Sequence, residues 1–564
     1  MIRDRIPDDV AEYIPGKLGV NLRKTKHDLK PGEAELEQNC YWDSNLRKRF
    51  GAARWTTVSA GTQVGTGGHK AYYGTGSARL ITVGTNLFEI SDAGSIVTLT
   101  STMTSGNNTY FRDWAQSDRC YISNGAEVPR YRDASGALAR LTGSYIPATP
   151  TQILPFADRL VAIQGDVVVV TDPRTDSVWS PATSTWSAYR GIGGSGNPTA
   201  VGIHSGSGSS DGNPEAQLLI FQRNTTTALI GQDFGSNVTA VSPPTGYDAQ
   251  LRSIDSRVGT SSLYSVCNVP GVGTFWFTSE RNVAWLPLGQ SVPRLIGNSL
   301  YSYRSDIPGI NDTNINALAQ VVMVYHDLKL KLYLPIEGNA YSTIQFWLDL
   351  RPLMENLASV LTQPSENIPA QWSGPHRGQS IRRVWVENQS GDPERLMGIE
   401  GNMNNGLFVY ELNPENYSLD DVGVSTSSAI DYWFKGHYWT GGMPGYVKAL
   451  YNTLIDSQGY INLATVTVND LHATVTNGFT ILQLNGSAFS NVTYGNGFRY
   501  GTGTLYGQNS ANNLGHVNYS SRAAFMPSGD ALQYEIRHAM GQHFGVNRIL
   551  PQAKVEKRQP LHNI

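Results

Sequence analysis

The chain has 564 residues, with 43 Lys or Arg against 46 Asp or Glu, so its net charge is -3 and only 16% of its residues are charged. This balance excludes a protein that coats nucleic acid through bulk positive charge. A hydrophobic fraction of 40% excludes a disordered chain. No run of 18 apolar residues predicts a membrane-spanning helix, and the first residues lack the apolar core of a standard secretory signal.

The first elements along the chain are paired, β-branched segments joined at Gly or Asn turns. Gly84, Asn124-Gly125 and Gly165 stand at three of these turns, where residues that tolerate a left-handed backbone are favoured. The pattern predicts seven hairpins, over residues 79–90, 119–131, 159–170, 217–231, 274–286, 328–349 and 395–410.

The seven hairpins begin about 40 to 67 residues apart, which is the spacing of the blades of a β-propeller. We therefore predict an all-β fold with a β-propeller of about seven blade-like units over residues 51–415. A short helix is expected within it at Leu353–Leu361. Two or three β-sandwiches would use the same strand patterns and remain the alternative.

A second all-β domain of sandwich type is expected at residues 416–564. The segments Tyr446–Ile455, Ile461–Val468, Ala531–His538 and Phe544–Ile549 predict its strands. A Gly-, Asn- and Tyr-rich stretch from Asn491 to Gly515 predicts a long loop or a partner-facing arm. Residues 1–50 are expected to form an extended docking segment.

Candidates for chemistry are few. The sequence has no Gly-x-Ser-x-Gly elbow, phosphate-binding loop or His-Glu-x-x-His motif. His538 and His543 are badly spaced for a metal, and Cys40, Cys120 and Cys267 lie far apart, so we predict no metal site, cofactor or catalytic residue. Carboxylates near blade turns could serve a glycosidase, but a turn role is favoured for each: Asp92, Asp118, Asp158 and Asp349.

Basic residues gather near the N-terminus, first at Arg23, Lys24, Lys26, His27 and Lys30, and then at Arg47, Lys48 and Arg49. They could contact nucleic-acid phosphates. Because Glu33, Glu35 and Glu37 lie between them, a solvated face or a salt-bridged subunit contact is favoured instead.

The segment Asp28–Gly51 resembles the entry motif of the tail nozzle (tail tubular protein B) and tail hub family of short-tailed bacteriophages. That motif reads Leu-x-x-Gly-Glu, an Asn, and then x-x-Gly-x-Leu-x-x-Arg-x-Gly, directly before the blades. The matching residues are Leu29, Gly32, Glu33, Asn39, Leu46, Arg49 and Gly51, with Asn45 where Gly is usual. We take these seven residues, together with Trp42, as a partner-docking or inter-domain element.

This resemblance implies a structural protein of the virion tail, made in the host cytoplasm and assembled as a homohexameric ring. The ring would meet a tail adaptor or upper tail-tube protein and the tail fibres, and double-stranded DNA would pass through its lumen. No integral membrane insertion is expected. A near-neutral chain suits such a conduit, because retained phosphate contacts would slow the genome.

Two other functions remain open. A propeller can carry a glycan-cleaving enzyme, which requires an acidic cluster at one mouth of the ring. It can also carry a carbohydrate-binding surface of exposed aromatic rings. We expect Trp276, Trp285 and Trp347 to be core residues instead, because they lie within strand patterns.

Overall fold

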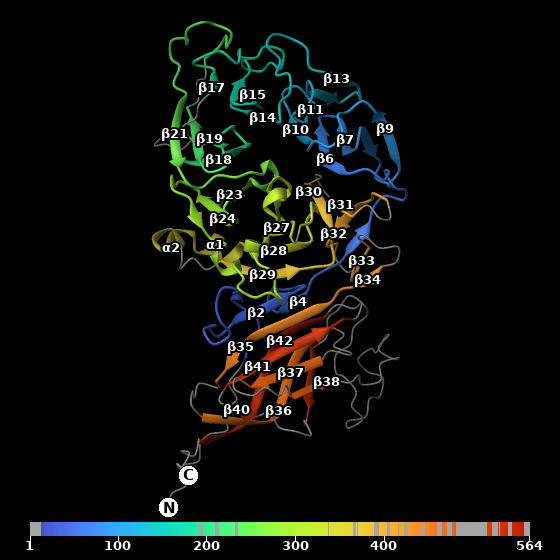
Figure 1. Cartoon of the computed structure of the whole chain (residues 1–564), viewed down its shortest axis with the longest axis vertical. Helices are drawn as coiled ribbons and strands as arrows, with labels where there is room; N and C mark the ends of the chain where they lie inside the picture. Colours follow the sequence, from blue (N-terminus) through green and yellow to red (C-terminus); the bar gives the residue numbers. More distant parts are fainter. Residues whose placement is uncertain are drawn as a thin grey trace, which may run out of the picture.

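The computed structural model describes residues 13–190, 196–208, 214–231, 235–336, 338–364, 368, 370–388, 394–402, 406–414, 417–421, 427–440, 446–459, 465–470, 477–480, 516–521, 528–529, 531–539 and 544–557. Figure 1 shows two parts, a ring of sheets and a smaller pair of sheets beside it. The ring is a seven-bladed β-propeller, and the smaller part is a β-sandwich. Their strands are numbered in chain order.

The first four blades are each an antiparallel sheet of four consecutive strands. Blade one comprises β6 (Gly65–Tyr73), β7 (Gly76–Val83), β8 (Asn86–Ile90) and β9 (Ile96–Thr100). Blade two comprises β10 (Tyr110–Trp114), β11 (Arg119–Ser123), β12 (Arg130–Asp133) and β13 (Leu138–Arg140). Blade three comprises β14 (Gln152–Phe156), β15 (Arg159–Gln164), β16 (Val167–Val170) and β17 (Ala188–Arg190). Blade four comprises β18 (Ala200–Gly208), β19 (Pro214–Phe221), β20 (Thr226–Ile230) and β21 (Gln250–Asp255).

Blades five and six follow the same plan, and blade seven is built differently. Blade five comprises β22 (Cys267–Val269), β23 (Gly273–Phe277), β24 (Val283–Pro287) and β25 (Arg294–Leu295). Blade six comprises β26 (Val322–His326), β27 (Lys329–Leu334), β28 (Ile344–Asp349) and β29 (Gln371–His376). Blade seven comprises β30 (Ile381–Glu387), β31 (Arg395–Glu400), β32 (Val409–Leu412), β5 (Ala52–Arg54), β33 (Leu419–Asp420) and β34 (Ser428–Ala429).

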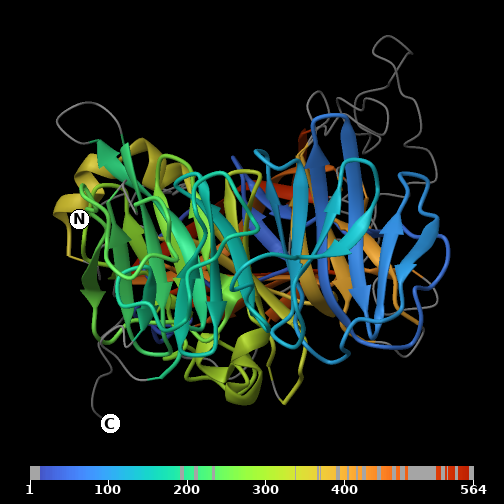
Figure 2. The ribbon, with the colours of Figure 1, turned by 90° about the horizontal axis from the view of Figure 1, so that it is seen from above.

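The seven predicted hairpins are the second and third strands of the seven blades, in order. Their turns use the expected residues: Gly84, Gly125 and Gly165 all have positive φ, which a residue without a Cβ adopts at little cost. The first strands of neighbouring blades lie against one another around the axis. Figure 2 shows the strands running along the thickness of the ring. The propeller prediction is confirmed.

A separate apolar core lies at each of the seven seams between neighbouring blades. At the seam between blades one and two, for example, Leu80 and Leu87 meet Phe111 and Ile122. A four-stranded sheet cannot bury both of its faces by itself, so each blade depends on two neighbours. Closing the ring supplies every blade with both neighbours.

The ring is closed by a strand from the opposite end of the chain. β5 pairs antiparallel with β32, Tyr410 lying opposite Arg54 and Leu412 opposite Ala52. Blade seven therefore combines residues separated by more than 350 positions. Because β5 immediately follows Gly51, the predicted entry motif leads directly into the closure of the propeller.

Helical structure in the described residues is limited to short pieces between strands. The expected helix at Leu353–Leu361 is present as two helices separated at Asn356, whose φ of -122° is not helical. The pieces are η1 (Leu263–Ser265), η2 (Asn298–Leu300), η3 (Ile310–Asp312), η4 (Ile315–Gln320), α1 (Arg351–Glu355) and α2 (Leu357–Thr362). No described helix has the length and apolar character needed to cross a membrane.

The sandwich combines strands from both ends of the chain in two sheets. The first sheet has the order β1 (Gly19–Val20), β2 (Glu33–Gln38), β35 (Tyr432–Trp439), β41 (Leu532–His538), β37 (Thr465–Asp470) and β38 (Asn477–Thr480). The second has the order β3 (Cys40–Trp42), β4 (Leu46–Lys48), β42 (Phe544–Lys557), β36 (Tyr446–Gly459) and β39 (His516–Ser521), with β40 (Ser528–Gly529) beside β36. One core fills the space between the sheets, with Ala34 and Cys40 packed among Phe434, Tyr534 and Ile549.

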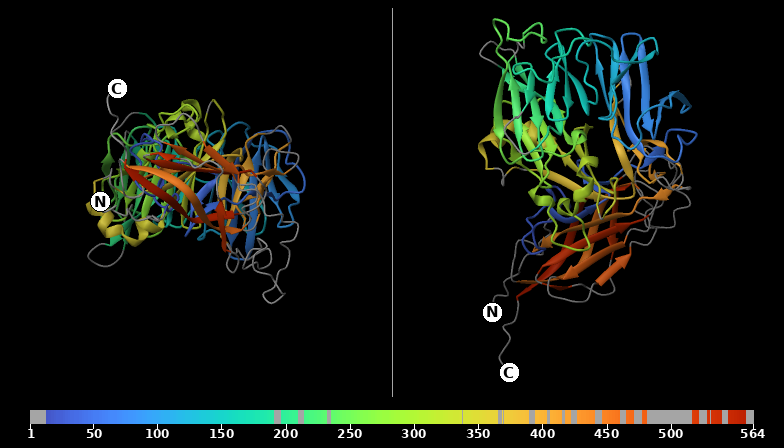
Figure 3. Two further views of the ribbon diagram at one scale, coloured as in Figure 1. Left: turned by 90° about the horizontal axis from the view of Figure 1, so that it is seen from below. Right: turned by 45° about the horizontal axis from the view of Figure 1, so that its top comes forward.

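Two expected boundaries differ from this arrangement. Residues 1–50 are not a separate extended segment where they are described, because β1 to β4 are strands of the sandwich. Strands β33 and β34 lie beyond residue 415 and yet complete blade seven. The sandwich stands next to blade six, where β1 and β2 contact β29 (Figure 3). His543 and the predicted loop from Asn491 to Gly515 lie outside the described residues.

Candidate functional site

Three of the motif residues, Asn39, Arg49 and Gly51, meet at the junction between propeller and sandwich. Asn39 stands between β2 and β3, which belong to opposite sheets, and its φ of 57° is left-handed. Asparagine tolerates that conformation better than most residues. Its side chain is buried: Nδ2 donates to the Asp431 carbonyl at 2.7 Å, and Oδ1 accepts from the Arg377 amide at 2.7 Å. Asn39 thus turns the chain from one layer to the other and ties that corner to the propeller.

Arg49 is the centre of the junction. It is 0% exposed, and its guanidinium makes a two-point pair with Asp420, through Nη1 to Oδ1 at 3.0 Å and Nη2 to Oδ2 at 2.5 Å. Its remaining N–H groups donate to Asn39 Oδ1 at 2.9 Å and to two backbone carbonyls, of Phe50 and Arg377. All five donors are therefore used, which is the condition under which a buried guanidinium is tolerated.

Two glycines permit this close packing. A Cβ on Gly51 would lie 1.7 Å from the carbonyl oxygen of Leu419, beside the partner Asp420. Gly378 has a φ of 98°, and a Cβ there would lie 2.9 Å from Asp420 Oδ2. Gln379 completes the cluster by donating from Nε2 to Asp420 Oδ1 at 2.9 Å. The glycine that ends the motif is required because two backbone segments touch there.

Gly32 and Glu33 lie at the other end of the motif, on the sandwich side. Gly32, with a φ of 88°, donates its amide to Nδ1 of His437 at 3.2 Å. The His437 ring stacks on Tyr13 at 4.5 Å, and burial lowers its pKa to about 4, so the imidazole is neutral at pH 7. Glu33 accepts from Lys24 Nζ at 2.8 Å and from the Lys30 amide at 2.7 Å. Both residues organise the turn that leads into β2.

The remaining motif residues have different surroundings. Leu46 is fully buried in the sandwich core, Trp42 is half-buried against it, and Leu29 is half-buried outside it. Asn45 stands where the family motif has glycine, and a residue that tolerates positive φ is the simplest reason for such an exchange. This reason is wrong: Ser44 is the left-handed residue, whereas Asn45 donates to Asn547 Oδ1 at 3.0 Å and accepts from Arg47 Nε at 2.7 Å.

Glu37 is a residue of the junction that the sequence did not single out. It is 0% exposed, and neither of its carboxylate oxygens accepts a hydrogen bond from any described residue. Burial raises its pKa well above the usual range. It lines a small cavity between β2, β3 and blade six, whose walls are Gly19, Glu37, Tyr41, Trp42, Lys329, Trp347, Asp349, Gln371, Trp372 and Ser373.

The basic residues of this region divide into two groups. Arg23, Lys26 and Lys30 are exposed. In the second group Lys48 and Arg49 are buried, and burial lowers the pKa of Lys48 to about 8. Two further ion pairs join the domains, one between Glu35 and Arg304, and one between Asp43 Oδ1 and Arg351 Nη1 at 2.6 Å. The buried members of the second group therefore make contacts within the chain, which is neither the solvated face nor the subunit contact favoured from the sequence.

The four candidate carboxylates lie on four different blades. Asp92, Asp118 and Asp158 occupy turns of blades one, two and three, and the latter two have positive φ values of 52° and 59°. Asp349 ends β28 and is held by the guanidinium of Arg351 at 2.5 Å. These positions suit turn and strand-end roles. The expected core tryptophans, Trp276, Trp285 and Trp347, are indeed buried, and His538 is buried beside Lys48.

The axis of the propeller is occupied by side chains. Tyr264 of η1, which precedes blade five, donates its hydroxyl to the Thr109 carbonyl at the start of blade two at 2.5 Å. Arg383 of β30 lies 4.1 Å from the Tyr264 ring centre, is fully buried, and donates to the Thr66 carbonyl at 3.2 Å and to Gln320 Oε1 at 2.6 Å. Blades two and five are not neighbours in the ring, so a bond between them crosses its centre.

Comparison with known proteins gives no family assignment: no protein-family model and no curated protein matches the chain. Similar solved structures include the RRP9 WD40 repeats (8% identity, TM-score 0.37), U3-55K (7%, 0.39) and virginiamycin B lyase from Staphylococcus aureus (10%, 0.37). They cover 64%, 65% and 62% of this chain and 99%, 98% and 95% of their own chains. All three are only distantly similar to this chain.

Proposed function

We propose that this protein is a structural component of a short-tailed phage tail, a nozzle or hub subunit that assembles as a homohexameric ring around the path of the ejected genome. In this role the propeller is a rigid wedge, and six wedges close a ring through repeated head-to-tail contacts. The sandwich is the part that continues the wedge toward neighbouring tail proteins.

One observation carries the proposal. The motif that resembles the tail family, Asp28–Gly51, is the segment that joins propeller and sandwich through Asn39, Arg49 and Gly51. A ring subunit that transmits contacts between neighbours benefits from domains held in one orientation. A buried two-point arginine pair supplies that orientation because its geometry is planar and directional.

Because side chains close the axis of the propeller, we place the conduit between subunits and not along the axis of a single subunit. Arg383 and Tyr264 span the centre of the propeller, so a DNA duplex has no path along that axis. Any lumen must then be formed by several copies of the chain. The net charge of -3 suits a wall along which DNA slides, because few phosphates would be retained.

Electron microscopy with mass measurement of the purified full-length chain tests the proposal. We expect a six-fold ring with an open centre, burying well over 1,000 Å² at each subunit contact, roughly the area that stable assemblies need. Polysaccharide cleavage and glycan binding are measured on the same preparation, because they are the signatures of the alternative surface-sugar function. A monomer that cleaves or binds glycans would contradict the proposal, as would a monomer without either activity.

A pair of variants makes the test specific to the junction. Arg49→Met should lower the fraction of rings, because the sandwich is no longer held in one orientation. Arg174→Met removes a matched but exposed arginine, whose ion pair with Asp158 spans 3.4 Å at the surface, and should leave the rings intact. Equal ring fractions in the two variants would show that ring assembly does not depend on the junction.

A further inference from the structure

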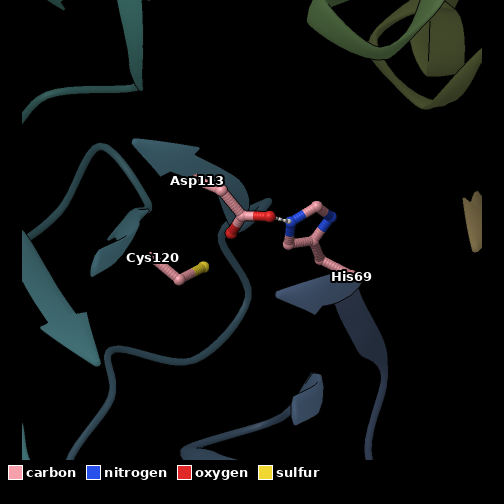
Figure 4. Close-up of side chains that lie close together, drawn as sticks. All are labelled: His69, Asp113 and Cys120. Carbon is pink, nitrogen blue, oxygen red and sulfur yellow. Dashed lines mark hydrogen bonds and ion pairs between the residues drawn. The ribbon is translucent and has the colours of Figure 1, made fainter. Parts of the chain in front are cut away.

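Three side chains with different donor atoms meet at the seam between blades one and two. His69 comes from β6, Asp113 from β10 and Cys120 from β11 (Figure 4). A ring nitrogen, a carboxylate oxygen and a thiol sulfur all lie within 4.8 Å of one another. In the sequence, His69 and Cys120 are separated by about one blade repeat, and only the ring brings them together.

The strand register produces this arrangement. Asp113 and Cys120 are directly opposite one another in the antiparallel pair of β10 and β11, so their side chains project from the same face of the sheet. β6 and β10 are neighbouring inner strands of the ring, which brings His69 to the same seam. The ring of His69 is held beside Phe111, at 6.2 Å between ring centres. Each donor is thus positioned by a strand and not by a loop.

The hydrogen bonds of this cluster leave one oxygen unused. Asp113 Oδ2 accepts from His69 Nε2 at 3.0 Å and from the Tyr72 amide at 3.2 Å. Oδ1 of the same carboxylate is shielded from solvent and accepts no hydrogen bond from an N–H or O–H group of the described residues, and the thiol of Cys120 interacts with this carboxyl group. The Cys120 side chain is fully buried on the same seam. A shielded carboxylate oxygen whose polar neighbours are a thiol and an imidazole is an arrangement that a cation completes.

We propose that His69, Asp113 and Cys120 bind a divalent transition-metal ion, with Zn²⁺ as the best match. Imidazole and thiolate donors select zinc and its neighbours over Mg²⁺ and Ca²⁺, which prefer all-oxygen sites. Zinc bonds of roughly 2.0–2.3 Å place tetrahedral donors about 3.3–3.7 Å apart, so side-chain rotations of a small size close the site. The inference does not depend on the tail function.

Binding releases one proton for each metal ion. The thiol proton of Cys120 passes to solvent, whereas the neutral imidazole of His69 moves its proton from Nε2 to Nδ1 and so frees Nε2 for the metal. The side chains of His69 and Asp113 are 22% and 24% exposed, so water reaches the fourth coordination position. Arg132, a nearby cation, is neutralised by Glu89 at 2.9 Å. The ion would staple blade one to blade two.

Cobalt titration of the untagged full-length chain tests this site. After treatment with a chelator, Co²⁺ should bind one per chain and produce a thiolate-to-cobalt absorption band in the near ultraviolet, which Zn²⁺ then displaces. Cys120→Ser should abolish the band. His69→Gln keeps the thiol and should weaken Co²⁺ binding at least tenfold. Cys267→Ser removes a different thiol and should leave both the band and the affinity unchanged.

Every outcome of this titration either supports or overturns the proposed metal site. Absence of a saturable band in the folded wild-type chain overturns the proposal, and so does a band that persists in Cys120→Ser or disappears in Cys267→Ser. If Cys120→Ser does not fold, the decision rests on His69→Gln, whose side chain is partly exposed: unchanged Co²⁺ affinity in that variant overturns the site.

Discussion

The propeller and the sandwich are both all-β, yet they are assembled in opposite ways. Six of the seven blades are sheets of four consecutive strands, so most of their backbone pairing is local. Both sheets of the sandwich combine strands from residues 19–48 with strands from residues 432–557. The propeller is thus specified blade by blade, whereas the sandwich exists only when the two ends of the chain meet. Local pairing forms with a lower loss of chain entropy than distant pairing.

The two regions contain matched buried ion pairs that allow a direct comparison. Arg49 and Asp420 join the sandwich to blade seven, with side chains 1% and 3% exposed. Arg79 and Glu387 join blade one to blade seven, also with side chains 1% and 3% exposed, through Nε to Oε1 at 2.5 Å and Nη2 to Oε2 at 2.6 Å. One pair locks the junction and the other locks the ring.

The largest effect is expected from breaking the junction pair. Arg49→Met leaves Asp420 buried without its cation, which should lower the free energy of unfolding by about 3–5 kcal/mol. In urea denaturation followed by circular dichroism and tryptophan fluorescence, we expect the sandwich to unfold at lower urea than the propeller. Arg79→Met should cost less, because Lys70 Nζ still lies 3.8 Å from Glu387 Oε2, and it should lower the stability of the propeller transition. A single shared transition in both variants would show that the two regions unfold as one unit.

A smaller effect is expected from the glycine that ends the motif. In Gly51→Ala the new methyl group meets the Leu419 carbonyl oxygen, and the backbone must move, at a cost of about 1–3 kcal/mol. Gly76→Ala is the matched control, because nothing lies within 4 Å of its Cβ. Denaturation midpoints of the two variants measure the difference. Equal midpoints would mean that the backbone segments at residues 51 and 419 can move apart with little loss of stability.

The smallest effect is a dependence on pH that belongs to the junction. Burial raises the pKa of Glu37 in the folded state, so between about pH 4.5 and that higher pKa the folded chain holds a proton that the unfolded chain has lost. Stability therefore falls as pH rises through this window. Glu37→Gln removes the penalty and should be more stable than wild type by about 1–2 kcal/mol at pH 7, but not at pH 4.

Denaturation of wild type and Glu37→Gln at several pH values measures this dependence. Glu280→Gln changes an exposed carboxylate in the loop before β24 and serves as the control, with no change expected at any pH. A constant difference between Glu37→Gln and wild type from pH 4 to pH 8 would contradict the proposed titration of Glu37.

The sequence alone determined the repeating unit of the fold. Alternating apolar residues and turn glycines located the middle hairpin of every blade, because both signals lie within about 20 neighbouring residues. The outer strands were harder to find: β13 and β17 have three residues each and β25 has two, too few for a period to appear. The motif Asp28–Gly51 was also visible in the sequence, but the residues that it contacts were not.

Only the tertiary structure decided which residues meet. Asp420 lies 371 residues from Arg49, β5 closes a blade that begins at Ile381, and His69 reaches Asp113 across a seam. None of these pairings leaves a periodic pattern, because the partners belong to separate segments whose spacing is set by ring closure. The sequence contained the strands and their turns. The fold must bury seven interblade cores and one sandwich core at the same time. That requirement brought together the residues of the junction and of the cluster at the first seam.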